Sequence, residues 1–178
     1  MPQPVESPPR PPTEAWTSLF EEFFAEGAPA AACAPLGAGA CVHLSIESPP
    51  HPPANLAFLK NNAGQIIMIE GPPPPPQASL TFSAQLAREV LTLKSDEISD
   101  FGLLILRAFL ERPRRLQAKI HVGFIELWRK GWFGVLTLGG GRVASYLASQ
   151  GLNGIGGIQR ALKALRSESS HLEKEPTP

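Results

Sequence analysis

The sequence has no excess charge and no apolar run long enough to cross a bilayer. Its 16 Lys and Arg balance its 16 Asp and Glu, so overall electrostatics do not favour nucleic acid as a partner. The most apolar segment, residues 101–110, is too short to span a membrane and contains Arg107. The N-terminus lacks the basic and apolar regions of a signal peptide. We therefore expect a soluble, cytoplasmic protein.

Groups that carry chemistry are also scarce. Cys33 and Cys41 lack CxxC spacing, and we interpret them as buried free thiols rather than a disulfide. His43 and His121 fall on strand faces without metal-ligand spacing. The glycines of residues 139–142 match neither a dinucleotide-binding motif nor a phosphate-binding loop, and we interpret them as a turn into a helix. The sequence therefore predicts no catalytic residue, no metal, no cofactor and no enzymatic activity.

The 20 prolines occur mainly in runs, and these runs mark segment boundaries. Residues 1–12 form a Pro-rich tail that we expect to be disordered, as we expect for the polar residues 167–178. Residues 13–40 predict a helix followed by a flexible connection rich in Ala and Gly. Residues 41–166 predict a single α+β domain with extra C-terminal helices.

Hydrophobic periodicity places the elements of that domain. Alternation of apolar and polar residues predicts strands over residues 41–47, 78–82 and 116–124. Residues 55–60 and 65–70, on either side of a predicted hairpin turn at 61–64, predict two more strands, and the second of these is apolar on both faces. Apolar residues at helical spacing predict helices after Ser83, over 101–110 and over 124–130, with two more after residues 142 and 157. The helix over 101–110 is apolar on almost every side, so it must be covered on more than one side.

The N-terminal helix carries a large aromatic stripe, which includes Trp16, Phe20, Phe23 and Phe24. One interpretation is a helix packed permanently on the core. The other is a lid over an apolar pocket, because a connection rich in small residues would hold the helix near the domain without fixing its position. We predict the lid.

Several stretches resemble the sterol carrier protein type 2 family. They are Gly64-Gln-Ile-Ile-Met-Ile-Glu-Gly71, Ala78-Ser-Leu-Thr-Phe-Ser83 leading into a helix, Arg107-Ala-Phe-Leu110 and Arg115-Leu-Gln-Ala-Lys-Ile120. Together they cover about residues 42–130. The chain departs from the family where Arg114 and Arg115 replace the usual Gly before the last strand, and after Trp132. The resemblance implies a mainly antiparallel five-stranded sheet with helices covering one face. It also implies an apolar tunnel for fatty acyl chains, sterols or similar lipids, without catalysis.

Two predicted helices and the last predicted strand direct their apolar residues toward one layer. The predicted ligand-binding residues are Leu86, Val90, Ile105, Phe109, Ile120 and Phe124. We predict that they line an internal apolar space.

Other functions stay open. An interaction or scaffold module would use an exposed apolar stripe to bind a partner protein, and an enzyme acting on a lipid would need a reactive group that the sequence does not display. Arg112, Arg114 and Arg115 form a basic turn that is either a solvated rim or a docking site for anionic membranes. We predict transient membrane contact there. The sequence does not indicate the oligomeric state.

Overall fold

A computed structural model describes residues 13–70, 74–110, 115–152 and 156 of the chain. The helices are α1 (Thr13–Ala25), α2 (Gly27–Ala32), α3 (Ala84–Thr92), α4 (Ile98–Leu110), α5 (Phe124–Arg129), α6 (Trp132–Leu138) and α7 (Gly140–Ser149). The strands are β1 (Cys41–Ser48), β2 (His51–Lys60), β3 (Ile66–Glu70), β4 (Ala78–Ser83) and β5 (Leu116–Ile120). No described helix is long and apolar enough to cross a membrane.

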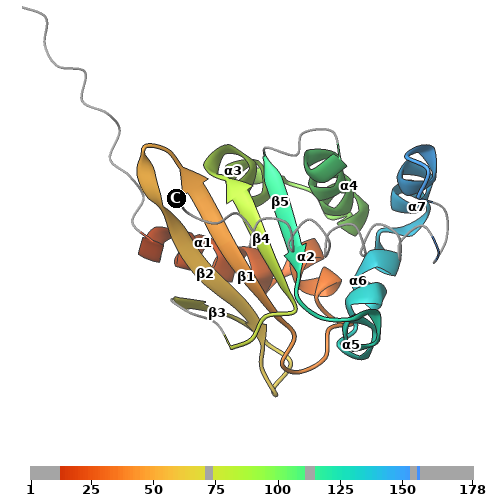
Figure 1. Cartoon of the computed structure of the whole chain (residues 1–178), viewed down its shortest axis with the longest axis horizontal. Coiled ribbons are helices and arrows are strands. Elements are labelled where there is room, and N and C mark those ends of the chain that lie inside the picture. The colour runs from red at the N-terminus through yellow and green to blue at the C-terminus, as the bar shows by residue number, and fades with distance from the viewer. Residues whose placement is uncertain (1–12, 71–73, 111–114, 153–155, 157–178) are drawn as a thin grey trace, which may run out of the picture.

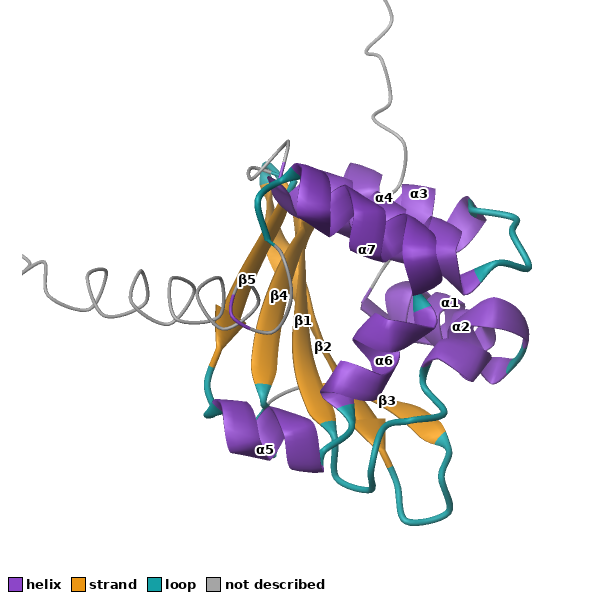
Figure 2. Cartoon of the chain, turned by 90° about the vertical axis from the view of Figure 1, so that its right-hand side faces the viewer, coloured by secondary structure: helices purple, strands orange, loops and turns teal. Residues whose placement is uncertain are grey.

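The strands form one five-stranded sheet in the order β3-β2-β1-β4-β5 (Figure 1). β1 pairs with β4 in parallel, and the other three neighbouring pairs are antiparallel. The helices lie mainly on one side of the sheet, as Figure 2 shows. The prediction of an α+β fold with a mainly antiparallel five-stranded sheet and helices on one face is confirmed.

Two strands differ from their predicted extents by more than one residue. β2 begins at His51, earlier than predicted. Pro52 and Pro53 lie in the first part of β2, before its regular pairing with β1 begins at Ala54. Pro52 and Pro53 therefore do not interrupt the backbone ladder. β5 ends at Ile120, and the chain turns into α5 at Phe124. The apolar alternation beyond Ile120 therefore belongs to a turn and a helix.

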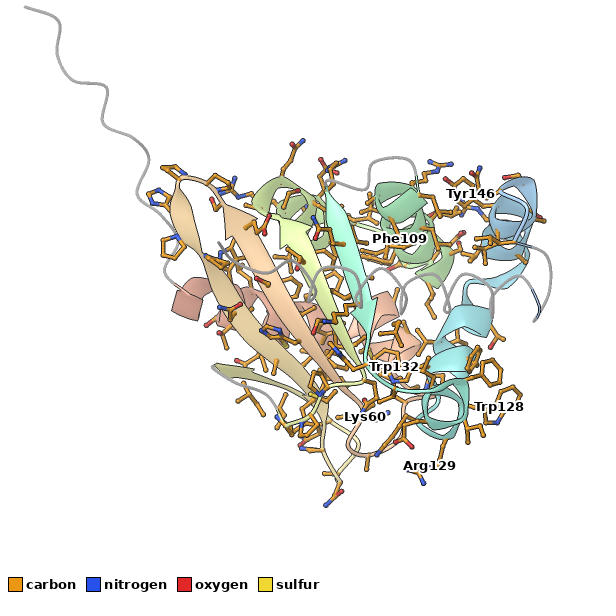
Figure 3. The ribbon with its side chains drawn as sticks, viewed as in Figure 1. Lys60, Phe109, Trp128, Arg129, Trp132 and Tyr146 are labelled. Carbon is orange, nitrogen blue, oxygen red and sulfur yellow. The ribbon has the colours of Figure 1, made fainter. Side chains whose placement is uncertain are left out.

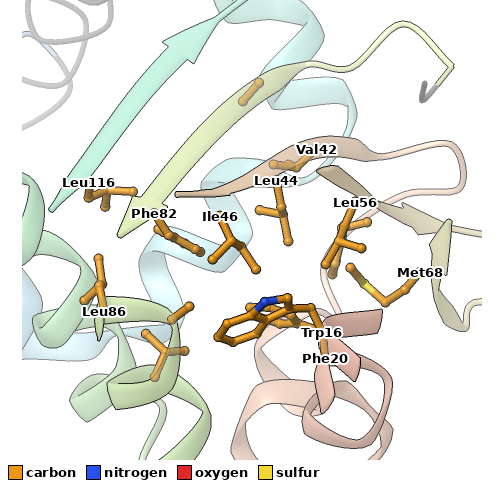
Figure 4. Close-up of a cluster of buried hydrophobic side chains, with 14 of the residues drawn as sticks. Trp16, Phe20, Val42, Leu44, Ile46, Leu56, Met68, Phe82, Leu86 and Leu116 are labelled. Atoms are coloured by element: carbon orange, nitrogen blue, oxygen red, sulfur yellow. The ribbon is translucent and has the colours of Figure 1, made fainter. Parts of the chain in front are cut away.

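The main core lies between the sheet and α1, α3 and α4 (Figure 4). On β1, Val42, Leu44 and Ile46 face this core, and the register places Leu56 of β2 opposite Leu44. Ile46 and Leu56 are 1% and 0% exposed. Burial of each such side chain contributes about 1.5–3 kcal/mol to folding.

The α1 stripe is part of this core. Trp16 is 4% exposed and Phe20 is 2% exposed, and α1 contacts both β2 and β3. Phe23 and Phe24 are partly buried against the same cluster, and the Phe24 ring meets the Phe58 ring of β2 at 5.0 Å between centroids. In this structure α1 is packed on the sheet, and the lid assignment stays a prediction.

The segment after α1 is not the aperiodic connection that we expected. It contains α2, because its run of alanines has high helix propensity and Pro29 is tolerated in the first turn. Farther along, Leu36 and Ala40 are 5% and 0% exposed. The buried Lys60 side chain donates hydrogen bonds to the carbonyl oxygens of Cys33 (2.8 Å) and Ala34 (3.0 Å), which fixes this segment to the end of β2.

The same segment also fixes the turn between α5 and α6. The Gly37 N–H donates to the Lys130 carbonyl at 3.0 Å, and Lys130 Nζ donates to the Ala38 carbonyl at 2.8 Å. Gly131 has a φ of 81°, and a Cβ atom there would overlap the Pro35 carbonyl oxygen. Only glycine satisfies both the backbone conformation and this close approach.

α7 packs on α4. Arg142 forms ion pairs with Asp100 (2.7 Å) and Glu97 (2.9 Å). Val143 approaches Gly102 of α4 closely: a Cβ atom added to Gly102 would lie 3.2 Å from a methyl group of Val143. The predicted turn at residues 139–142 thus leads into α7, and Arg142 in its first turn holds α7 to α4. The two tails and the predicted helix after residue 157 lie outside the described residues.

We predict that Gly131→Ala destabilises the fold far more than Gly64→Ala. Both glycines have a positive φ, 81° and 80°, but a Cβ atom added to Gly64 would have no neighbour within 4 Å. Gly64→Ala should therefore cost only the conformational penalty of about 1–2 kcal/mol. Gly131→Ala adds a steric overlap with the backbone, worth roughly a further 1–3 kcal/mol. Urea denaturation of both variants tests this, and equal losses would contradict it.

Candidate functional site

Burial of the inner sheet face is uneven from one edge to the other. Beneath α1, Leu44 of β1, Phe58 of β2 and Met68 of β3 are 5–7% exposed, while Ile66 at the start of β3 is partly buried. On β4 and β5, Phe82 and Leu116 at one end are buried, whereas the inner-face residues Leu80, Ala118 and Ile120 are only partly buried. Apolar surface therefore stays accessible on the inner face at this end of the sheet.

α4 and α6 supply the facing wall. Both contact the rest of the helical layer, and α4 contacts β5. Their apolar side chains pack against the core and are also only partly buried; they are Leu104, Ile105, Phe109, Trp132 and Val135. We call these five residues, together with Leu80, Ala118 and Ile120 of the sheet, the apolar site. It has the predominantly apolar lining that is typical of pockets for hydrophobic ligands.

The structure divides the six predicted ligand-binding residues among three environments. Ile105, Phe109 and Ile120 belong to the apolar site. Leu86 and Val90 of α3 are 0% and 6% exposed, so they lie in the sealed core beside it. Sequence reasoning missed Trp132 and Val135, because residues 132–138 did not show the periodicity of a helix clearly.

Phe124 lies elsewhere, because β5 ends before it and the residue begins α5. Its ring packs against Phe133 at 4.6 Å and against Trp128 at 6.2 Å between centroids. Trp128 is 61% exposed, and the neighbouring Ile125 is 81% exposed. Figure 3 shows Trp128 and Arg129 pointing away from the sheet. We call Phe124, Ile125, Trp128 and Phe133 the α5 patch.

The predicted basic turn is only partly within the described residues. Arg112 and Arg114 lie outside them. The Arg115 side chain is 19% exposed and pairs with Glu89 of α3, with 2.5 Å between Nη2 and Oε2. Its charge is therefore already balanced within the protein. The turn precedes β5 and the α5 patch follows it, so the two lie at opposite ends of that strand.

A separate groove of about 360 Å³ lies where α1 and α2 meet the connection between α3 and α4. Its lining residues are Phe23, Gly27, Ala28, Pro29, Leu93, Lys94, Ser95, Asp96 and Phe101. The rings of Phe23 and Phe101 meet edge to face at 5.5 Å. This groove combines two aromatic rings with charged and polar groups, so it differs in character from the apolar site.

One pair with catalytic side-chain types lies on the outer sheet face. Ser79 Oγ is 2.7 Å from His121 Nε2. Burial lowers the pKa of His121, and repulsion by Lys119 and His43 lowers this pKa further. A general base must carry a proton during catalysis, and cationic neighbours destabilise that protonated form. The pair is thus poorly suited to activate Ser79.

The cysteines are free and buried, as predicted. Burial raises the pKa of the Cys33 thiol to about 11, against a smaller opposing effect of Lys60. A thiol in this state is a poor nucleophile. Among the described residues, no three His, Cys, Asp or Glu side chains are grouped to hold a metal ion.

Known proteins resemble this chain in fold rather than in sequence. No protein-family model matches the chain, and no curated protein matches it. A similar solved structure is described as "UbiJ-SCP2 Ubiquinone synthesis protein". It has a TM-score of 0.41 and 12% sequence identity, and the match covers 72% of this chain and 95% of that chain. At this identity and TM-score, we draw nothing from it about ligand or activity.

We predict that Lys119→Gln raises the pKa of His121, because it removes a repelling charge. The pKa lies below its usual value of 6.5 in the folded protein, so the unfolded chain takes up this proton first. The contribution of His121 to stability is therefore complete above pH 6.5 and is lost as pH falls through the folded pKa. NMR titration of the imidazole protons measures the shift. Lys94→Gln is the control, and an unchanged His121 pKa in Lys119→Gln would contradict the assignment.

Proposed function

We propose that the protein binds an apolar ligand, such as a fatty acyl chain, a sterol or a similar lipid, in the apolar site without catalysing a reaction. The observation that carries this proposal is the uneven burial of the sheet. Large apolar side chains on β4, β5, α4 and α6 stay partly accessible while the neighbouring core is sealed. A ligand that covered them would gain about 25 cal/mol for each Å² of apolar surface removed from water.

The other functions receive less support. An interaction module that used the α1 stripe would need that stripe at the surface, whereas Trp16 and Phe20 are buried in this structure. A lipid-modifying enzyme would need reactive groups at the apolar site. The Ser79–His121 pair lies on the opposite face of the sheet, and the named residues of the apolar site carry no acid, base or nucleophile.

A second proposal concerns membranes. We propose that the α5 patch, rather than the basic turn alone, makes transient contact with an anionic membrane. Trp and Ile partition favourably into the lipid interface. Arg129 beside them forms an ion pair with Glu126, but its side chain is 73% exposed, and such a surface pair is weak enough to be exchanged for an anionic head group. A protein partner has less support, because even a fully exposed Trp offers only about 150–250 Å². Stable protein interfaces bury about 800 Å² per partner.

We expect Ile120→Trp to weaken binding of a fluorescent fatty acid at least tenfold, because the larger side chain occupies ligand volume in the apolar site. The matched control is Lys119→Trp, which places the same side chain on the other face of the same edge strand. It should leave affinity within about twofold. Fluorescence titration measures both, after circular dichroism has shown that each variant is folded. Equal affinity of both folded variants would refute the location of the site.

We further expect the double substitution Ile125→Ser and Trp128→Ser to reduce sedimentation with vesicles of phosphatidylcholine and phosphatidylserine at least fivefold. Loss of two interfacial side chains removes the apolar part of the interaction. The control is Leu19→Ser, which changes an exposed leucine (44%) on α1. Wild-type binding should fall as salt rises, because salt screens the attraction of Arg129 for anionic lipid. Unchanged sedimentation of the double variant would exclude the α5 patch as the contact.

A further inference from the structure

The apolar site contains one buried polar atom without a partner. Trp132 Nε1 is shielded from solvent and has no hydrogen-bond partner among the described residues. Buried donors in folded proteins are nearly always paired, so such an atom needs an explanation. The other named residues of the site, on β4, β5, α4 and α6, have purely hydrocarbon side chains. The indole N–H is therefore the single side-chain donor among the named residues of the site.

The position of this indole is fixed by the backbone around it. Gly131, with its φ of 81°, and Gly134 both lie directly against Pro35, where a Cβ atom on Gly134 would be 2.6 Å from the proline Cβ. The Gly37–Lys130 hydrogen bond holds the preceding turn to the same segment. Trp132 also packs against the main core, and Figure 3 shows it on the sheet side of α6. α6 therefore cannot shift freely to bring the N–H to water.

We propose that Trp132 Nε1 is a ligand-positioning donor and that the ligand is an apolar molecule with an oxygen acceptor, such as a carbonyl, ether or hydroxyl oxygen. The inference rests on the proposed function, because it assumes that a ligand enters the apolar site. A pure hydrocarbon would leave the N–H unpaired, whereas an oxygen acceptor would pair it. Pockets for apolar ligands commonly use a few polar groups in this way to fix orientation.

The test compares two probes that differ at a single carbon, 2-hexanoylnaphthalene and 2-hexylnaphthalene. The ketone only accepts hydrogen bonds, so it isolates the role of the N–H. Affinities are measured on the full chain by displacement of the fluorescent fatty acid. Trp132→Phe should weaken ketone binding about five- to tenfold and leave hydrocarbon binding within about twofold, as expected for the loss of one buried hydrogen bond. The control Tyr146→Phe, which removes a side-chain hydroxyl from α7 outside the apolar site, should change neither.

A second measurement separates positioning from structural support. The carbonyl stretching band of the bound ketone should lie at lower frequency in wild type than in Trp132→Phe, because a hydrogen bond weakens the C=O bond. The melting temperature of the ligand-free variant should not fall by more than a few degrees, since the lost N–H has no protein partner to leave behind. A large fall in melting temperature, or an identical carbonyl frequency in both proteins, would overturn the proposal.

The proposed function and the donor role of Trp132 fail differently. If the wild-type protein does not bind the fluorescent fatty acid, and neither probe binds to it, the proposed function itself fails. If wild type binds both probes and Trp132→Phe weakens them equally, ligand binding stands but the donor role is refuted. A selective loss of the ketone supports both.

Discussion

The structure depends on the backbone of residues 33–40, which joins the helical layer to the sheet. On one side, its carbonyl oxygens accept hydrogen bonds from the buried Lys60 at the end of β2. A buried ammonium group is costly unless its protons are paired, so this contact is strongly constrained. On the other side, the same segment holds the α5–α6 turn through Gly37 and through the close approach of Gly131 to Pro35. One short stretch thus sets the position of α1, β2 and α6.

The uneven cover of the sheet follows from this arrangement. α1 lies over β2 and β3 and seals that end with aromatic side chains. At the β4–β5 end, α4 and α6 face the sheet, and the side chains of both walls stay partly accessible. A core closes when both layers supply enough apolar volume, and at this end they do not close it completely. The physical basis for a ligand-binding function is therefore a difference in packing between two ends of one layer.

Chemistry is distributed unevenly as well. The Ser79–His121 pair lies on the outer face, beside Lys119, where repulsion opposes protonation of the imidazole. The Cys33 thiol is buried and its pKa is raised. The named residues of the apolar site offer hydrocarbon and a single indole N–H. Such a division favours binding over catalysis at the apolar site, and it leaves the hydrogen-bonding pattern of the ligand as the main source of selectivity.

The sequence by itself determined the number and approximate positions of the strands, the faces of β1 and β4, and the amphipathic character of α1, because side-chain periodicity is a local property. It also indicated that Ile105, Phe109 and Ile120 face one layer, and the structure brings them together. The tertiary structure decided the rest. Phe124 lies in another cluster than predicted, because β5 ends at Ile120. The segment 33–40 is held in place by contacts with Lys60 and Gly131. Those contacts join residues far apart in the chain, and no local pattern encodes which backbone carbonyl a distant side chain will reach.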